Sequence, residues 1–285
     1  MINILLALFF SGCLYIAFKI FKHFNVDTFQ AIVFNYLIAF ILGLLLNQSN
    51  IELNQVYEQG WFANCVILGI LFIVVFYVIG KTTQVNGLTV ASVASKMSMI
   101  IPILFGIFYF KENITTLIIL GIVLALFAVF FVSKNDNEKI NFSSFKFPIL
   151  LFFGAGIIDT LINYTQHTHL TKDEVSLFSA FTFLFAFIFG CFSIVYKILK
   201  KEFHFELRNF IAGIALGVPN FFSMFYLTKA LQTENMDSSI IFTILNIGVI
   251  LFTTFVGIIF FKEKMSKQNY FGIALAIIAL FLVTN

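Results

Sequence analysis

Charged residues are scarce along this sequence of 285 residues. They make up 11% of it and hydrophobic residues make up 60%, whereas soluble domains carry about 25% charged residues. A chain of this composition does not supply the polar surface that a water-soluble globular protein needs. The composition therefore excludes an ordinary soluble domain and predicts that lipid is the solvent for most of the chain.

Several chemistries lack the residues that they need. Cys13, Cys65 and Cys191 lie inside apolar stretches, without zinc-ligand spacing or a disulfide framework. No glycine-rich phosphate-binding loop is present, and no histidine or second aspartate lies deep in an apolar stretch, where an intramembrane hydrolase would need it. His167 and His169 lie in a short polar loop without a second ligand cluster. We therefore expect no enzyme, no metal and no cofactor, and the net charge of +3 gives no reason to expect a nucleic-acid partner.

Long apolar runs dominate what is present. A helix crosses the bilayer core with about 20 mostly apolar residues, and ten such stretches are bounded by charged or polar residues. The expected spans are 2–22, 29–47, 61–80, 88–110, 114–133, 147–166, 174–197, 209–231, 238–261 and 268–284. The runs are too long and too continuously apolar for porin-type strands. We predict an all-α integral membrane protein with ten transmembrane helices and no soluble domain.

The two halves of the chain repeat each other. GIFYFKENITTLIILGIVLALFAVFFV (106–132) aligns without a gap with GIIFFKEKMSKQNYFGIALAIIALFLV (257–283), sharing the F-K-E triplet and a glycine nine residues after its glutamate. A five-helix unit is odd-numbered, so a second copy would have inverted topology, which is typical of secondary transporters. The predicted units are 1–133 and 147–285, joined by a linker at 134–146.

These features resemble the drug/metabolite transporter superfamily, EamA type, over the whole chain. The marks of the resemblance are Pro102 in the fourth span and the turns that end at Glu112 and Glu263. Lys111 and Lys262 stand where the family usually has glycine. The resemblance implies transport of small organic metabolites, often outward, through a cavity lined largely by the first, third, fourth, sixth, eighth and ninth spans. We expect Glu112 and Glu263 to place charge at the N-termini of the helices that follow them.

Lys96 is a cation inside the fourth span. It lies about 8 residues, or about 12 Å, from the start of that span, and a lysine at mid-helix costs about 2.5–3.5 kcal/mol. Asp159, in the sixth span, is the one comparably deep carboxylate, and it lies about 4 residues, or about 6 Å, further along a helix of the same direction. Two interpretations remain open: a pair that handles substrate or protons, and a static pair that fixes helix packing.

Other polar residues share faces with this pair. Ser92, Lys96 and Met99 follow helical spacing, as do Asp159, Asn163 and Gln166. The complete set of candidate substrate-binding residues is Lys96, Asp159, Asn163, Asn246, Ser92, Tyr15, Tyr77, Asn220 and Tyr226. One cation, one anion, amides and phenols suit a zwitterionic substrate, although each Ser, Asn or Tyr alone is as well explained by helix packing or an interfacial position.

The sequence thus predicts a secondary transporter that exports a small polar metabolite, amino-acid-like or another zwitterion, by alternating access through a midplane cavity. The open alternatives are uptake of a sugar, nucleotide sugar or quaternary amine, and a non-transporting membrane receptor or assembly protein. The expected partners are a small-molecule substrate, the lipid bilayer and protons as a coupling ion. We expect a monomer or a homodimer.

The distribution of basic residues predicts an orientation. The loops that join spans 1–2, 3–4, 5–6, 7–8 and 9–10 hold thirteen Lys and Arg residues, and the other loops hold three. Because positively charged loops stay in the cytoplasm, both termini should lie outside, although members of the family more often have cytoplasmic termini. We expect a multi-pass protein of a bacterial cytoplasmic membrane.

Overall fold

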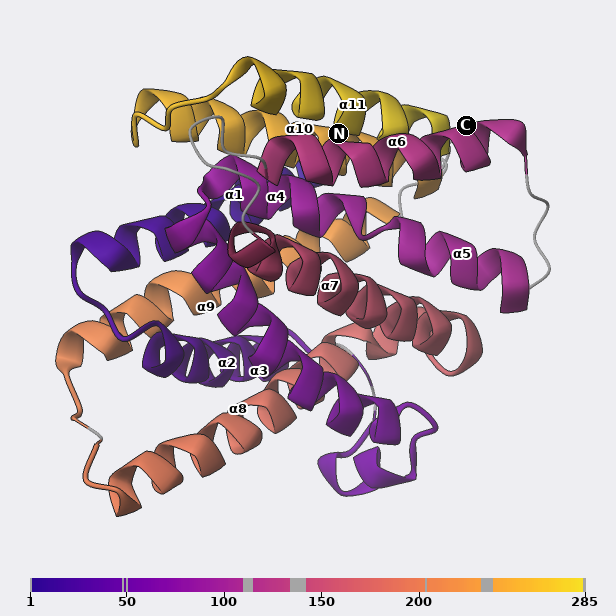
Figure 1. Cartoon of the computed structure of the whole chain (residues 1–285). Helices are drawn as coiled ribbons and strands as arrows, with labels where there is room; N and C mark the ends of the chain where they lie inside the picture. The colour runs from indigo at the N-terminus through magenta and orange to yellow at the C-terminus, as the bar shows by residue number, and fades with distance from the viewer. Residues whose placement is uncertain are drawn as a thin grey trace.

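A computed structural model describes residues 2–47, 49, 51–109, 115–133, 142–202, 204–231 and 238–283. Every regular element in these ranges is a helix (Figure 1). The elements are α1 (Ile2–His23), α2 (Thr28–Leu45), η1 (Leu53–Glu58), α3 (Phe62–Val85), α4 (Leu88–Met97), α5 (Ile100–Tyr109), α6 (Thr116–Ser133), α7 (Phe142–Thr168), η2 (Lys172–Glu174), α8 (Val175–Leu199), α9 (Leu207–Leu231), α10 (Ser238–Ile259) and α11 (Lys267–Val283).

Eight helical segments of the described chain are long and apolar enough to cross a membrane. The α4–α5 pair makes one of them, Leu88–Gly106, and two shorter apolar helices cover Ile244–Ile259 and Lys267–Leu282. The all-helical membrane architecture is therefore confirmed for the described residues. The count of ten spans and the inverted repeat stay predictions.

The fourth span is not one continuous helix, so the expectation for 88–110 was wrong in this respect. α4 ends at Met97 and α5 begins at Ile100, with a turn at Ser98 and Met99. Pro102 explains the break, because proline has no N–H to give to the carbonyl of residue 98 and its ring clashes with that carbonyl. A mid-span break leaves free backbone groups, which a membrane protein tolerates only where protein or a water-filled cavity surrounds them.

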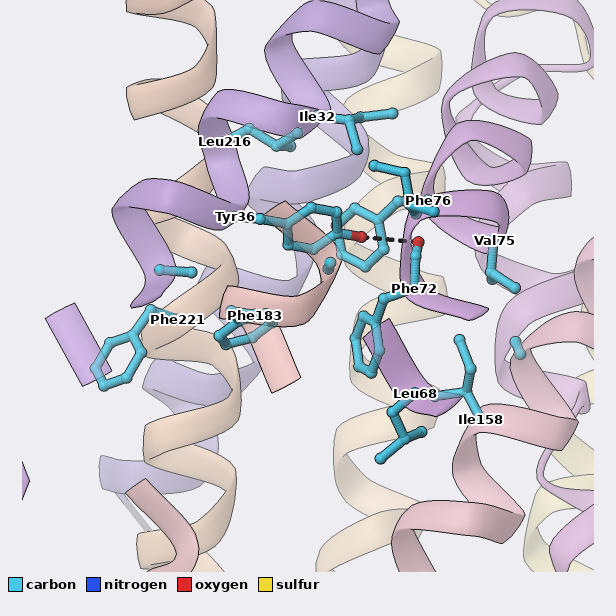
Figure 2. Close-up of a cluster of buried hydrophobic side chains, with 14 of the residues drawn as sticks. Ile32, Tyr36, Leu68, Phe72, Val75, Phe76, Ile158, Phe183, Leu216 and Phe221 are labelled. Carbon is cyan, nitrogen blue, oxygen red and sulfur yellow. Dashed lines mark hydrogen bonds between the residues drawn. The ribbon is translucent and has the colours of Figure 1, made fainter. Parts of the chain in front are cut away.

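An aromatic core joins α2, α3 and α8 (Figure 2). The hydroxyl of Tyr36 donates to the backbone carbonyl of Phe72 at 2.7 Å, and the ring of Phe183 stacks on Tyr36 at 5.9 Å. Tyr36 is fully buried, and its bond satisfies a hydroxyl that would otherwise be costly in an apolar setting. The side chains around this core therefore hold three helices together as a scaffold for the rest of the bundle.

A polar seam joins α2 to α9. Asn220 donates its amide to Asn35 at 3.1 Å, and Asn209 donates to Gln30 at 3.0 Å. Asp27 caps the start of α2 by accepting from the backbone of Phe29 and Gln30, and its own N–H donates to Asn209. Amide pairs of this kind hold membrane helices in register, since lipid supplies no alternative partner.

A second core joins α4, α6, α10 and α11. α6 and α11 run side by side in Figure 1 and pack along their lengths. Small buried side chains, Ala125 and Ala128 on α6 and Ala276 and Ala279 on α11, line this contact, and small residues allow helix backbones to approach closely. The cluster therefore anchors α4, which carries Lys96, to the C-terminal helices.

Candidate functional site

The break after α4 determines where Lys96 lies. Lys96 is in the last turn of α4, where the free carbonyls of a helix C-terminus favour a positive charge. Its side chain is half-buried, and within the described chain its ammonium has no hydrogen-bond or ion-pair partner. A cation that is placed at a helix end in mid-bundle without a partner is available to an anionic ligand.

α7 presents a polar, accessible face. At 3.6 residues per turn, Asp159, Asn163 and Gln166 project from one side of the helix, and Phe153 and Ile157 project from the opposite side. Both faces are exposed, but the second is apolar and suits lipid. We therefore infer that the polar face belongs to the interior of the bundle.

The flanks of α7 support this assignment. On one flank, Thr165 accepts from Asn64 of α3 at 2.9 Å. Tyr164, on the same side of α7 as Phe153 and Ile157 but farther along the helix, packs edge-on against Phe105 of α5, with ring centroids 6.4 Å apart. Asp159 lies on a third side of α7, where its carboxylate is 3.4 Å from the hydroxyl of Ser98, in the turn after α4. Asp159 is thus directed toward the break between α4 and α5, and it is exposed there.

Lys96 and Asp159 share this part of the bundle. They interact electrostatically, yet they are not among the ion pairs within 4.0 Å in the described chain. Ser98, in the turn after α4, donates to the carbonyl of Ser95 at 2.5 Å and lies 3.4 Å from the Asp159 carboxylate. Lys96 and Asp159 therefore form a site with one cation and one anion, and the turn at Ser98 lies beside them.

Three further candidates lie around α4. Tyr15 of α1 lies near Ser95 of α4. Asn246 of α10 donates its amide to the sulfur of Met99 at 3.1 Å, and Ser92 accepts from Thr253 of α10 at 2.7 Å. Tyr15, Asn246 and Ser92 are all buried, so they border the accessible site, and Ser92 also joins α4 to α10.

The remaining candidates lie elsewhere in this conformation. Asn220 is bonded to Asn35 in the α2–α9 seam. Tyr226 stacks on Phe10 of α1 at 5.8 Å. Tyr77 lines a separate cavity near the C-terminal end of α3. Their roles in substrate binding stay predictions, and the structure does not bring them to Lys96 and Asp159.

Ser98 was missed as a candidate. The sequence feature that could have identified it is its position four residues before Pro102, because proline has no N–H to bond to the Ser98 carbonyl. A helical pattern that contains proline predicts a break or kink before it. The break gives Ser98 a turn conformation, from which its hydroxyl reaches both Ser95 and Asp159.

The carboxylate of Glu263 joins three segments at the end of the bundle where α1 ends and α4 begins. Glu263, in the connection between α10 and α11, accepts from the Lys19 ammonium of α1 and from the backbone N–H of Leu88, the first residue of α4, at 2.6 and 2.9 Å. The expectation that Glu263 charges the helix that follows it was wrong, since it caps the distant α4 instead. Glu112 lies outside the described residues.

Two glycines make room for this carboxylate. Gly87 has φ +106°, and a Cβ there would lie 3.0 Å from a Glu263 oxygen. A Cβ on Gly257 would lie 2.8 Å from the other oxygen. The side chains of Lys19 and Glu263 are only 18% and 12% exposed. We call this set of Lys19, Gly87, Leu88, Gly257 and Glu263 the carboxylate seat.

Comparison with known proteins places the chain in a family. The sequence profile of the EamA-like transporter family matches residues 1–134 and again 146–285. An uncharacterised protein of Haemophilus influenzae is 29% identical over 286 residues, covering 98% of this chain and 96% of that protein. A crystal structure matches with a TM-score of 0.63 at 14% identity, covering 99% of this chain and 96% of that one, which shows likeness of fold alone. The chain belongs to the EamA-like transporter family and is a membrane transporter of the drug/metabolite transporter type.

Proposed function

We propose that the protein is a secondary transporter that moves a small zwitterionic organic metabolite outward across a bacterial cytoplasmic membrane. The observation that carries the proposal is the pair of a half-buried Lys96 and an exposed Asp159, which interact in mid-bundle and, within the described residues, form no direct ion pair. A ligand with a carboxylate and an ammonium group suits this pair, because its carboxylate can bind Lys96 and its ammonium can bind Asp159. Family membership supports transport as such.

The proposed movement is alternating access. The carboxylate seat joins α1, α4 and the α10–α11 connection at one end, while the polar face of α7 is accessible toward the other. This asymmetry is what one conformation of an alternating-access transporter presents. In the opposite conformation the seat would separate and α7 would be covered.

Proton coupling is part of the proposal. The Asp159 carboxylate would carry a proton in the opposite conformation when no substrate is bound, because α7 would then be covered and a buried carboxylate without a direct cationic partner is costly. The binding of a substrate ammonium would then displace that proton. Counting protons moved per substrate in sealed vesicles would test this coupling.

The direct test of the function is untargeted mass spectrometry of medium and cell extract. Cells would express the wild type, Lys96→Ala, Lys200→Ala or no transporter, at matched membrane levels; Lys200 is an exposed lysine at the end of α8. A zwitterion enriched in the medium only with the wild type and Lys200→Ala supports export. Enrichment inside the cell would reverse the direction, and no difference in a broad set of media would contradict transport of a metabolite.

The proposed orientation has both termini outside, since basic loops favour the cytoplasm. The carboxylate seat would then close the cytoplasmic end. Fusions at the C-terminus test this: a phosphatase that is active only outside the cytoplasm should be active, and a cytoplasm-dependent fluorescent protein should not. The reverse result would place the seat at the outer face without affecting the substrate proposal.

A further inference from the structure

A cavity of about 920 Å³ lies apart from the Lys96 site. Its lining comes from three places: the connection into α2, the last turns of α3 and the last turns of α8. Neither Lys96 nor Asp159 is part of it. It lies at the end of the bundle where the connection into α2 meets the α8–α9 connection, through the bond from Gln30 to the carbonyl of His204 at 3.1 Å.

The course of α8 creates this cavity. Gly190 is buried against Val33 of α2 and Ile73 of α3. Beyond it the helix no longer packs as closely, and Phe192 and Tyr196 are 66% and 58% exposed. The last two turns of α8 therefore line an open cavity beside the start of α2 and the end of α3.

Part of the cavity lining is aromatic. Phe29 and Tyr77 meet edge to face with centroids 6.3 Å apart, and Phe192 and Tyr196 line the α8 side. Aromatic residues gather where the hydrocarbon of a bilayer meets its headgroups. This part of the cavity suits the upper acyl chains and glycerol of a lipid better than it suits a fully polar solute.

The rim of the cavity carries two cations and two carboxylates. Lys197 lies 4.0 Å from Asp27 and 5.1 Å from the centre of the Phe29 ring, so these two charges are already close together. Lys81 lies over the Tyr77 ring at 5.5 Å. Within the described residues, Lys81 and Glu202 have no oppositely charged partner, which leaves one cation and one anion for a ligand.

We propose that this cavity binds a single glycerophospholipid whose headgroup carries a phosphate and a primary ammonium, as in phosphatidylethanolamine. The phosphate would contact Lys81, the ammonium would contact Glu202, and the acyl chains would run past Tyr77 and Phe192. An anionic headgroup of the glycerol type would bring its charge to Lys81 but give Glu202 no cation. This charge balance selects the zwitterionic lipid.

Native mass spectrometry of the purified full-length chain tests the site without any transport assay. The protein would be released from nanodiscs that contain phosphatidylethanolamine and phosphatidylglycerol in equal amounts, and the retained lipid would be identified while activation energy is raised. The wild type should retain one phosphatidylethanolamine after other lipids have left. Retention of phosphatidylglycerol instead, or no preference, would overturn the proposed headgroup.

Two variants locate the contact. Lys81→Ala should lower the affinity for phosphatidylethanolamine roughly tenfold, the size expected for one charged hydrogen bond. Glu202→Gln should bring the two lipids to nearly equal retention, because it removes the rim carboxylate that has no cationic partner among the described residues. The matched controls are Lys264→Ala and Glu58→Gln, which alter exposed charges outside the cavity.

The controls should retain the wild-type preference. If Lys264→Ala weakens lipid retention as much as Lys81→Ala, the preference reflects overall charge and the site is disproved. Folding is monitored by the melting temperature, and a Lys81→Arg variant keeps the charge in case Lys81→Ala is unstable. Lys81→Arg should retain the lipid, and loss of binding in a folded Lys81→Arg protein would contradict a phosphate contact.

Discussion

The two ends of the bundle differ in how their helices are joined. At one end the Glu263 carboxylate binds α1 and α4 together, in a seat that is mostly shielded from solvent. Toward the other end Asp159 and Asn163 of α7 are exposed, and Asp159 lies beside the break between α4 and α5. This conformation is therefore closed by one charged group and open along a polar face.

The largest effect is expected at the accessible region. Lys96→Ala and Asp159→Asn should each lower the transport rate of the identified substrate in vesicles by about 10- to 100-fold, since each removes a charged contact worth roughly 1.5–3 kcal/mol. Asp173→Asn, which alters an exposed carboxylate in η2, is the control. A static pair would give the opposite pattern, in which either variant lowers the melting temperature and the surviving folded protein transports normally.

The next largest effect is expected at the carboxylate seat. Glu263→Gln leaves the mostly buried Lys19 without its counter-charge and weakens the cap on Leu88, so it should lower the stability by about 2–4 kcal/mol. Glu206→Gln breaks the exposed pair with Arg208 and should cost at most about 1 kcal/mol. Chemical unfolding in detergent compares the two.

The double variant Lys19→Gln/Glu263→Gln sharpens this test. It removes both charges, so it should recover part of the stability that Glu263→Gln loses. Equal losses in Glu263→Gln and Glu206→Gln would show that the seat contributes no more than a surface ion pair.

A smaller loss is expected from Gly87→Ala. The φ of +106° is unfavourable for alanine, and the added Cβ would lie 3.0 Å from Glu263; backbone strain of this kind costs about 1–3 kcal/mol. Measured in the Glu263→Ala background, the same change should cost less, because the contact with the carboxylate is gone. An equal cost in both backgrounds would assign the whole effect to the backbone.

The smallest effect is expected in the α2–α9 seam. A double-mutant cycle of Asn35→Ala and Asn220→Ala should give a coupling of about 0.6 kcal/mol, the average for hydrogen bonds between membrane helices. Transport by Asn220→Ala should follow the amount of folded protein. A raised KM at unchanged stability would instead support the sequence-based prediction that Asn220 binds substrate.

The sequence was most informative where a local pattern decides the structure. Apolar runs bounded by polar residues predicted spanning helices, and eight segments of the described chain meet the length and hydropathy of a membrane span. Family membership followed from Pro102 and the Glu263 turn and is confirmed. These features are readable because each depends on residues that are close in the chain.

Contacts between distant segments were harder to predict. Glu263 was expected to act on the next helix, but it binds Lys19 and Leu88, 244 and 175 residues away in the chain. Nothing local distinguishes the two possibilities, because both place a carboxylate near a helix N-terminus. The proximity of Lys96 to Asp159 could be anticipated only because both are charged at similar depths.

The most direct test of the account measures access to both regions in one preparation. Asn163→Cys and Thr89→Cys, each in a background in which Cys13, Cys65 and Cys191 are replaced by serine, would be labelled with a membrane-impermeant maleimide; Thr89 is buried in the first turn of α4, near the seat. We predict rapid labelling of Asn163→Cys and slow labelling of Thr89→Cys, each from its own side of the membrane. Addition of Glu263→Gln should raise the labelling of Thr89→Cys and lower that of Asn163→Cys together. Independent changes at the two positions would contradict alternating access controlled by the carboxylate seat.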